Sequence, residues 1–390
     1  MQELPLNPAW YRPDHLDFRE TVRRFVAREL LPQVAAWDEA GTFPRELYAR
    51  AAETGLFGLG FPAEYGGVEG SDMFHRLIAS LELAQCGSGG LVASLMSHTI
   101  GAPPIAELGS AELKARVLPQ ILSGEKISAL AITEPSGGSD VAALRTTARR
   151  DGDHWLVNGE KTYITSGMRA DYLTVAVRTD PAARGPRGLS VLLVEGDVPG
   201  LGRSLLSKMG WWASDTAHLS FSDCRVPVGN LLGVEGAGFA AVMQNFNAER
   251  FSLAASALGF AWVCYQEALA WARERRTFGQ RLADHQVIRH RLVDMRTRIE
   301  ASRALLEDTA ARMNQQAAPD AGLVASLCML KNAATRTMQY CADAAVQIEG
   351  GMGYMRGTQA ERIYREVKVN MIGGGAEEIM KDLAARQLEL

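Results

Sequence analysis

The sequence predicts an α+β protein of several domains, and two changes of pattern along the chain carry this prediction. Apolar residues first recur at helical spacing, change near Lys126 to short alternating or continuous runs, and return to helical spacing after Gly238. At about 150 residues per domain, 390 residues correspond to two or three domains. We therefore expect a helical domain, a β domain and a second helical domain, over residues 1–125, 126–232 and 233–390.

The first third of the chain is expected to be helical from Asp14 to about Ser123. Its apolar residues, such as Val22, Phe25, Val26 and Leu30, recur at three and four positions, so that they share one face of a helix.

The middle third contains short apolar runs separated by Gly, Pro and Asp. Runs of this length and punctuation are typical of β-strands. We predict strands at residues 127–132, 154–159, 172–177 and 189–194.

The last third begins with a candidate helix from about Phe239 to Arg275, and further helices follow to the C-terminus. Pro319 and Asp320 mark one connection between them. The order helix, sheet, helix lacks the strand–helix alternation of a doubly wound nucleotide-binding fold.

Composition excludes several classes of protein. The chain has 41 Lys and Arg against 45 Asp and Glu, a net charge of −4, without the basic field of a nucleic-acid-binding protein. Five scattered cysteines are typical of neither a zinc site nor a disulfide scaffold, so we expect a cytoplasmic protein. No signal peptide is recognisable, and no apolar run approaches the roughly 18 residues that would span a membrane.

Two short motifs are better explained by chance. Gly58, Gly60 and Ala63 match a dinucleotide-binding spacing, but no strand precedes them and Pro62 interrupts the motif. The Ser-x-x-Lys pattern that begins at Ser123 lacks its companion elements. The seven histidines form no ligand motif, so we expect no metal site.

Five further strings, in the same order along the chain, resemble the signatures of the acyl-CoA dehydrogenase family. They are Thr133–Asp140, Lys161–Gly167, Lys208–Pro227, Arg275–Gln286 and Gln347–Gly353. Taken alone, the first is equally well explained as a turn. The resemblance extends from about residue 14 to residue 388. It implies a helical N-terminal domain, a β-barrel-like middle domain and a C-terminal four-helix bundle.

The resemblance also implies FAD bound between the middle domain and the C-terminal bundle, partly by a second subunit of a homotetramer built as a dimer of dimers. The residues implied near the flavin ring or the thioester are Leu130, Ile132, Thr133, Gly138, Ser139, Tyr163 and Thr165. Those implied near the pyrophosphate and adenosine, largely across the subunit interface, are Arg275, Thr277, Phe278, His285, Gln286, Gln347, Gly350 and Gly351. Ala376 and Glu378 complete the expected cofactor site.

The expected catalytic base departs from the family's best-known pattern. Where many members carry a glutamate near the C-terminus, this chain has Gly373–Ala376. It is most similar to the long-chain and isovaleryl-CoA dehydrogenases, in which the base lies on the long helix. The corresponding residue is Glu249, which desolvation should make a better base. Gly374 keeps a backbone N–H that can donate to the thioester oxygen.

The same resemblance implies a substrate site and a reaction. Its expected substrate residues are Ser139, Asn247, Arg250, Gly373 and Gly375, with Arg250 facing the CoA phosphates. Gly373 replaces a tyrosine ring and would admit longer or methyl-branched acyl groups, or it merely serves a glycine-rich turn.

We expect trans-2,3 dehydrogenation of an acyl-CoA, with electrons passed to an electron-transfer flavoprotein. Two rival functions stay open: an oxygen-using flavoenzyme of the same fold, either an oxidase or a hydroxylase, and a catalytically silent partner subunit. An acyl group on a carrier protein instead of CoA is also open.

Overall fold

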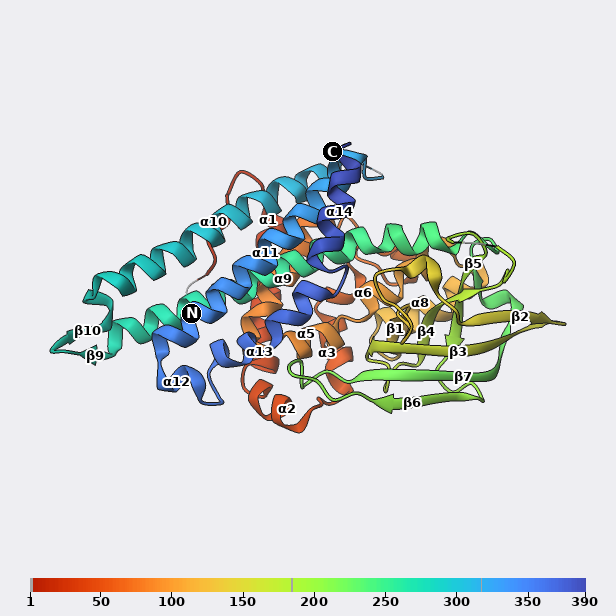
Figure 1. Cartoon of the computed structure of the whole chain (residues 1–390), viewed down its shortest axis with the longest axis horizontal. Helices are drawn as coiled ribbons and strands as arrows, with labels where there is room; N and C mark the ends of the chain where they lie inside the picture. The colour runs from red at the N-terminus through yellow and green to blue at the C-terminus, as the bar shows by residue number, and fades with distance from the viewer. Residues whose placement is uncertain (1–2, 184, 317) are drawn as a thin grey trace.

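The computed structural model describes residues 3–183, 185–316 and 318–390. Helices from both ends of the chain pack together in one half of the molecule, and the sheet forms the other end (Figure 1). The predicted order of helical, β and helical segments is confirmed.

The N-terminal segment is helical, with one long interruption that the sequence analysis did not predict. Between Thr54 and Asp72 the chain forms turns, two single-turn 3₁₀ helices and an isolated bridge between Leu59 and Val68, and Gly55, Gly60 and Gly66 adopt left-handed φ angles there. The helices are α1 (Pro13–Phe25), α2 (Val34–Ala40), α3 (Glu46–Glu53), α4 (Met73–Leu83), α5 (Gly89–Leu95), α6 (His98–Gly101), α7 (Pro103–Leu108) and α8 (Ala111–Leu122).

The middle segment is one open, mostly antiparallel sheet. Its path runs β6-β7-β3-β2-β4-β5-β8, with β1 pairing in parallel with β4. In the described part of the chain the end strands β6 and β8 do not pair, so the sheet is not a closed barrel. The strands are β1 (Ser128–Ala131), β2 (Thr147–Asp151), β3 (His154–Thr165), β4 (Tyr172–Arg178), β5 (Leu189–Glu195), β6 (Leu201–Leu205), β7 (Thr216–Pro227) and β8 (Leu231–Leu232).

Burial on both faces explains the continuous apolar runs of β4 and β5. On β4, Leu173 and Val175 pack into the interior of the sheet domain. Tyr172 and Ala176 point the other way, into a second core that includes Val117 of α8. Helices therefore cover one face of the sheet.

The C-terminal segment is a helical bundle around α9 (Gly238–Glu274), which lies within one residue of its predicted bounds. Small side chains let α9 pack closely against the N-terminal helices, and a Cβ on Gly259 would lie 2.6 Å from that of Ala84. The remaining elements are β9 (Arg276–Thr277), β10 (Gln280–Arg281), α10 (Gln286–Gln315), α11 (Ala321–Glu349), α12 (Gly351–Tyr354), α13 (Gln359–Ile372) and α14 (Glu377–Gln387).

The five cysteines are free and buried. Within the described residues, no helix combines the length and apolar character that crossing a membrane requires.

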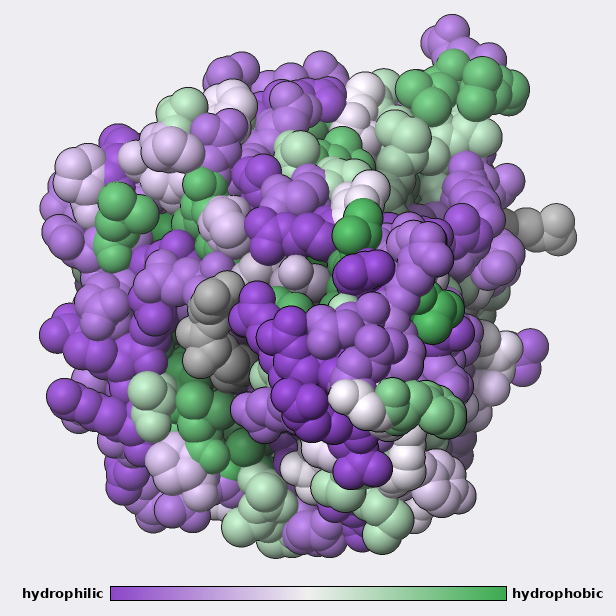
Figure 2. Space-filling view, turned by 90° about the vertical axis from the view of Figure 1, so that its left-hand side faces the viewer, coloured by the Kyte–Doolittle hydropathy of each residue, from purple (hydrophilic) through white to green (hydrophobic). Residues whose placement is uncertain are grey.

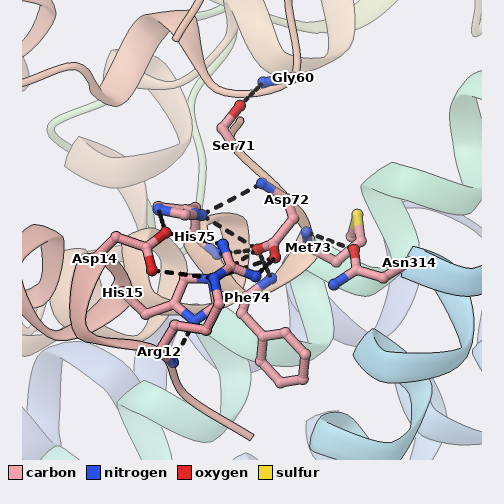
Figure 3. Close-up of polar contacts among 10 residues, drawn as sticks. All are labelled: Arg12, Asp14, His15, Gly60, Ser71, Asp72, Met73, Phe74, His75 and Asn314. Carbon is pink, nitrogen blue, oxygen red and sulfur yellow. Dashed lines mark hydrogen bonds and ion pairs between the residues drawn. The ribbon is translucent and has the colours of Figure 1, made fainter. Parts of the chain in front are cut away.

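The start of α4 is fixed by a polar network centred on Asp72 (Figure 3). Asp72 Oδ1 accepts from the N–H groups of Phe74 at 2.9 Å and His75 at 3.2 Å, which caps the helix. Arg12 donates to Asp72 Oδ2 at 2.8 Å, and His15 Nε2 lies 3.1 Å from Oδ1. The network thus joins α1 to the first turn of α4.

We expect Asp72→Ala to lower the free energy of unfolding by about 1–2 kcal/mol, because it removes the cap of α4. Asp72→Asn keeps an acceptor for the helix N–H groups and should lose less. Urea unfolding followed by circular dichroism compares the two variants, and equal losses would contradict the role of the cap.

Candidate active site

Glu249 projects from α9 into a cavity between this helix and the N-terminal helices. Three of the other wall residues, Arg76, Ala79 and Ser80, lie on α4. The remaining wall residues are mostly apolar: Leu56, Leu59, Phe61, Met96, Thr99, Ala248 and Ser252. A single carboxylate at one side of a mainly apolar cavity is a suitable arrangement for general-base chemistry.

The surroundings of Glu249 favour a carboxyl group that titrates near neutrality. Burial raises its pKa to about 7, although Arg250 and Lys331 act in the opposite direction. Among the described residues its Oε2 atom is buried and has no hydrogen-bond partner. The carboxylate is therefore not engaged in a structural ion pair.

The glycine turn Gly373–Gly375 lies beside Glu249, between α13 and α14. Gly374 has a φ of +66°, and a Cβ built on it would lie 3.7 Å from Glu249 Oε1. In the part of the chain that the structure covers, the N–H of Gly374 donates to no acceptor. A polar hydrogen thus remains available next to the carboxylate.

Two cations hold this turn through its carbonyl groups. Arg250 Nε donates to Gly374 O at 3.2 Å, and Lys331 Nζ donates to Gly375 O at 2.7 Å and to Met371 O at 2.8 Å. Both side chains are buried. We infer that they fix the direction of the Gly374 N–H.

The position of Arg250 differs from the expectation that it faces CoA phosphates. Only 5% of the residue is exposed, and its Nη1 donates to Asn247 Oδ1 at 3.0 Å. The guanidinium is directed into the protein because the turn carbonyl and the Asn247 amide satisfy it there.

Lys331 was missed by the sequence analysis. It is fully buried on α11, and burial lowers its pKa to about 8. The available signal was a single lysine following the apolar run Leu327–Leu330, a pattern that suggests a buried cation with specific partners.

A buried ion pair organises the loop that contains Thr133, Gly138 and Ser139. Glu134 Oε1 lies 2.9 Å from Lys161 Nζ on β3, and the Glu134 carboxylate also accepts from the N–H groups of Arg145 and Thr146. Lys161 donates in addition to Ile132 O at 2.9 Å. The pair therefore ties the end of β1 to β3.

The predicted flavin-side residues are gathered by this arrangement. Leu130 lies on β1, Ile132 and Thr133 follow it, and the N–H of Thr162 on β3 donates to Thr133 O at 2.8 Å. Gly138 and Ser139 are exposed on the same loop.

Tyr163 and Thr165 lie on β3, and Tyr163 falls within an irregularity in the pairing of β3 with β7. Tyr163 has a φ of +61°, and 71% of the residue is exposed. A bulge of this kind turns a side chain away from the regular sheet. The exposed Tyr163 ring is therefore available to pack against a flat aromatic ligand.

Most of the other predicted FAD residues lie at the end of the molecule opposite the sheet (Figure 1). Arg275 follows Glu249 by 26 residues (275 − 249), which along the helix is about 39 Å. Thr277 and Phe278 belong to the β9–β10 hairpin, His285 and Gln286 start α10, and Gln347, Gly350 and Gly351 lie at the end of α11. One chain therefore does not bring the two groups of residues together.

The end of the molecule that carries the β9–β10 hairpin and α12 is polar, with scattered apolar side chains. Phe278 and Tyr354 are 98% and 85% exposed. In the view of this end, hydrophobic surface occurs as separate patches among hydrophilic residues (Figure 2). Cβ atoms on Gly350 and Gly351 would meet no described atom within 4 Å, so the backbone there is open to a ligand or a partner chain.

Ala376 and Glu378 lie at the start of α14, directly after the glycine turn. Glu378 is exposed. These two residues therefore follow the turn that lies beside Glu249 in space, and they are not part of the hairpin.

Within the residues that the structure describes, one group of potential metal ligands comes together, Asp14, His15 and His75 (Figure 3). The sequence analysis expected no metal site. His15 Nδ1 accepts from the N–H of Arg12 at 3.0 Å, and His75 Nδ1 lies 3.3 Å from the N–H of Asp72. Their Nε2 atoms face Asp72 and Asp14. Since every ring nitrogen has a partner, we interpret the group as part of the helix-capping network.

Comparison with known proteins yields one family along the chain. The profile of the acyl-CoA dehydrogenase N-terminal domain matches residues 12–125, that of the middle domain 129–224 and that of the C-terminal domain 236–389.

Individual proteins of this family are similar over nearly the full length. The mitochondrial long-chain specific acyl-CoA dehydrogenase of Mus musculus is 36% identical, covering 97% of this chain and 87% of its own. The cyclohexane-1-carbonyl-CoA dehydrogenase of Geobacter metallireducens is 38% identical, covering 95% and 96%. The structure of an acyl-CoA dehydrogenase from Geobacillus kaustophilus superposes with a TM-score of 0.93 at 37% identity, covering 98% and 99%.

Proposed function

Because the chain belongs to the acyl-CoA dehydrogenase family, we propose that it converts an acyl-CoA thioester to the trans-2-enoyl-CoA with Glu249 as the catalytic base. The protein is an enzyme of this family, and FAD is its cofactor. The base, the substrate and the electron acceptor belong to the proposal.

One observation carries the proposal: a carboxylate without a structural partner faces a mainly apolar cavity beside a free backbone N–H. A pKa of about 7 leaves Glu249 partly ionised at neutral pH and basic enough to accept a carbon-bound proton. Buried carboxylate oxygens usually have a hydrogen-bond partner, and Glu249 Oε2 has none among the described residues.

In the reaction, Glu249 takes the proton from the α-carbon of the thioester. The N–H of Gly374 donates to the thioester oxygen, where negative charge accumulates as the proton leaves. Arg250 and Lys331 keep this donor in position through the turn carbonyls. FAD supplies the acceptor for the hydride that departs from the β-carbon.

We further propose that the FAD site is shared between subunits of a homotetramer. The distance of about 39 Å between Glu249 and Arg275 exceeds the length of an extended dinucleotide cofactor. The hairpin residues of one subunit would therefore hold the pyrophosphate and adenosine of FAD bound to another.

Arg275→Ala should weaken FAD retention without unfolding the bundle, since Arg275 is exposed at the end of α9. Gel filtration with simultaneous absorbance at protein and flavin wavelengths measures both properties. Arg386→Ala, an exposed arginine on α14, serves as the control. A monomer that retained FAD would contradict a shared site.

The acyl group is proposed to be long or methyl-branched. The relatives named above include a long-chain specific enzyme and one named for a cyclic acyl-CoA. Gly373 itself caps α13 and is not among the described residues that line the cavity, so the length and branching of the chain rest on these relatives.

A panel of straight and branched acyl-CoA thioesters, mixed anaerobically with the enzyme, tests the range of substrates. Preference for butyryl-CoA over both isovaleryl-CoA and palmitoyl-CoA would contradict the proposal of a long or methyl-branched acyl group. Electron-transfer flavoprotein as acceptor, a cytoplasmic location and domain boundaries at residues 125 and 232 complete the proposal.

A further inference from the structure

The cavity that contains Glu249 also contains a cation, Arg76 on α4. Most other wall residues are apolar. Acyl chains without a polar end have no group that could pair with a guanidinium, and covering that guanidinium with an apolar chain is unfavourable. The presence of Arg76 therefore needs an explanation in terms of what enters the cavity.

The surrounding structure fixes Arg76 in place. Its own N–H donates to Asp72 O at 3.3 Å, one turn into the helix that the capping network holds (Figure 3). A Cβ on Gly60 would overlap the guanidinium, so this glycine leaves the room that Arg76 occupies. The N–H of Gly60 donates to Ser71 Oγ at 3.0 Å, which ties that loop to the same network.

Arg76 has few partners within the protein. Its Nη2 donates to Leu59 O at 3.3 Å, and no carboxylate in the described ranges lies within 4 Å of it. Glu107 acts on it only at longer range, and burial lowers the pKa of Arg76. A guanidinium carries five N–H donors, so most of them remain for a ligand.

Two neighbouring side chains, those of His98 and Thr99, are neutral, and the one carboxylate that lines the same cavity among the described residues is that of Glu249. The His98 ring stacks on Phe57 with 4.1 Å between ring centroids. Burial, with a smaller effect of Arg76, lowers the pKa of His98 to about 3, so this ring is neutral. Thr99 Oγ1 donates to Met96 O, and Thr99 contributes only a neutral hydroxyl.

We propose that the cavity accepts an acyl thioester whose far end carries a carboxylate, with that carboxylate paired to Arg76 and the reacting carbons at Glu249. This inference rests on the proposed function, because it assigns the thioester end to Glu249. A carboxylate is favoured over a neutral acceptor because it matches the two parallel N–H groups of a guanidinium and compensates its charge.

The test compares hexanoyl-, octanoyl- and decanoyl-CoA with the dicarboxylic thioesters of the same carbon count, hexanedioyl-, octanedioyl- and decanedioyl-CoA. For the FAD-loaded enzyme, we expect kcat/KM for the best dicarboxylic thioester to exceed that of its matched partner by about 10- to 100-fold. Arg76→Met should remove or reverse the preference, mainly by raising KM for the dicarboxylic thioester. Arg76→Lys should retain part of it.

Arg50→Gln, which changes an exposed arginine on α3, should keep the parental preference. Equal or lower activity of the parent enzyme toward every dicarboxylic thioester would overturn the proposal. An equal loss of activity toward both series in Arg76→Met, despite native circular dichroism, would also overturn it.

Measurements of thioester binding test this inference independently of the proposed function. Calorimetry with Glu249→Gln, or with the parent enzyme if no thioester reduces the flavin, gives the ratio of the two dissociation constants without turnover. Tighter binding of the dicarboxylic thioester supports the role of Arg76 even if the reaction proves different. Equal binding refutes it even if dehydrogenation is observed.

Discussion

We expect Glu249→Gln to slow flavin reduction by acyl-CoA by about two to four orders of magnitude, the usual effect of losing a general base. Glutamine is nearly isosteric and cannot accept the α-proton. The substitution also removes a buried charge, so folding and FAD binding should persist. Stopped-flow absorbance under anaerobic conditions measures the rate directly.

The pH dependence of the rate of flavin reduction provides a second test of this prediction. Only ionised Glu249 can act as a base, so the parental rate should rise with pH and level off above the pKa of about 7. Bound substrate and FAD would move that value, but the direction is fixed. In Glu249→Gln the rise should disappear.

Two further variants sharpen the interpretation. Glu112→Gln changes an exposed carboxylate on α8 and should behave like the parent. Gly374→Glu in the Glu249→Gln background should recover part of the rate, since a Cβ at residue 374 lies 3.7 Å from Glu249 Oε1. The left-handed φ of residue 374 makes that rescue incomplete. A parental rate in Glu249→Gln would show that another residue is the base.

The second large effect is expected from Lys161→Met. Lys161 is fully buried, and its loss would leave the Glu134 carboxylate without its countercharge. Removing one partner of a buried ion pair costs about 3–5 kcal/mol. The loop that carries Thr133 and Ser139 should loosen as well, so FAD should dissociate more readily.

Urea unfolding measures the loss of stability. The increase in flavin fluorescence as FAD dissociates measures the loss of FAD binding. Lys381→Met is the matched control, because Lys381 is exposed and its ion pair with Glu377 should contribute about 0.5 kcal/mol or less. Similar stability losses in the two variants would contradict the assigned role of Lys161.

The stability that the Glu134–Lys161 ion pair contributes should also depend on pH in a defined direction. Burial tends to raise the pKa of Glu134, but Lys161 and the Thr146 hydrogen bonds outweigh it, and the net shift is downward. A carboxyl group whose pKa is lower in the folded state stabilises the fold at pH values above its pKa in the unfolded chain, which is about 4.3. That stabilisation is lost as the pH falls through the folded pKa, and Lys161→Met should weaken this dependence.

The sequence predicted the elements whose pattern is local. The runs at Tyr172 and Leu189 became β4 and β5, and the long helix from Phe239 became α9. The interruption between Thr54 and Asp72 was missed, because the helical spacing on both sides concealed the effect of its glycines. The openness of the sheet also depends on long-range pairing that no local pattern reveals.

The candidate site was predictable only in part. The family strings indicated Glu249 and the glycine turn, and the structure places them side by side. The inward direction of Arg250 could not be predicted, because it depends on the Gly374 carbonyl 124 residues later. Arg76 and Lys331 belong to no recognised string, and only the packing of α4 and α11 around α9 reveals their positions.

Anaerobic mixing of the FAD-loaded enzyme with the acyl-CoA panels, followed by mass spectrometry of the product, tests the central claim most directly. The account predicts that the flavin is bleached and that the acyl group loses two hydrogens to become a trans-2-enoyl thioester. A flavin that stays oxidised with every thioester, or a product that has gained oxygen when air is admitted, would contradict it.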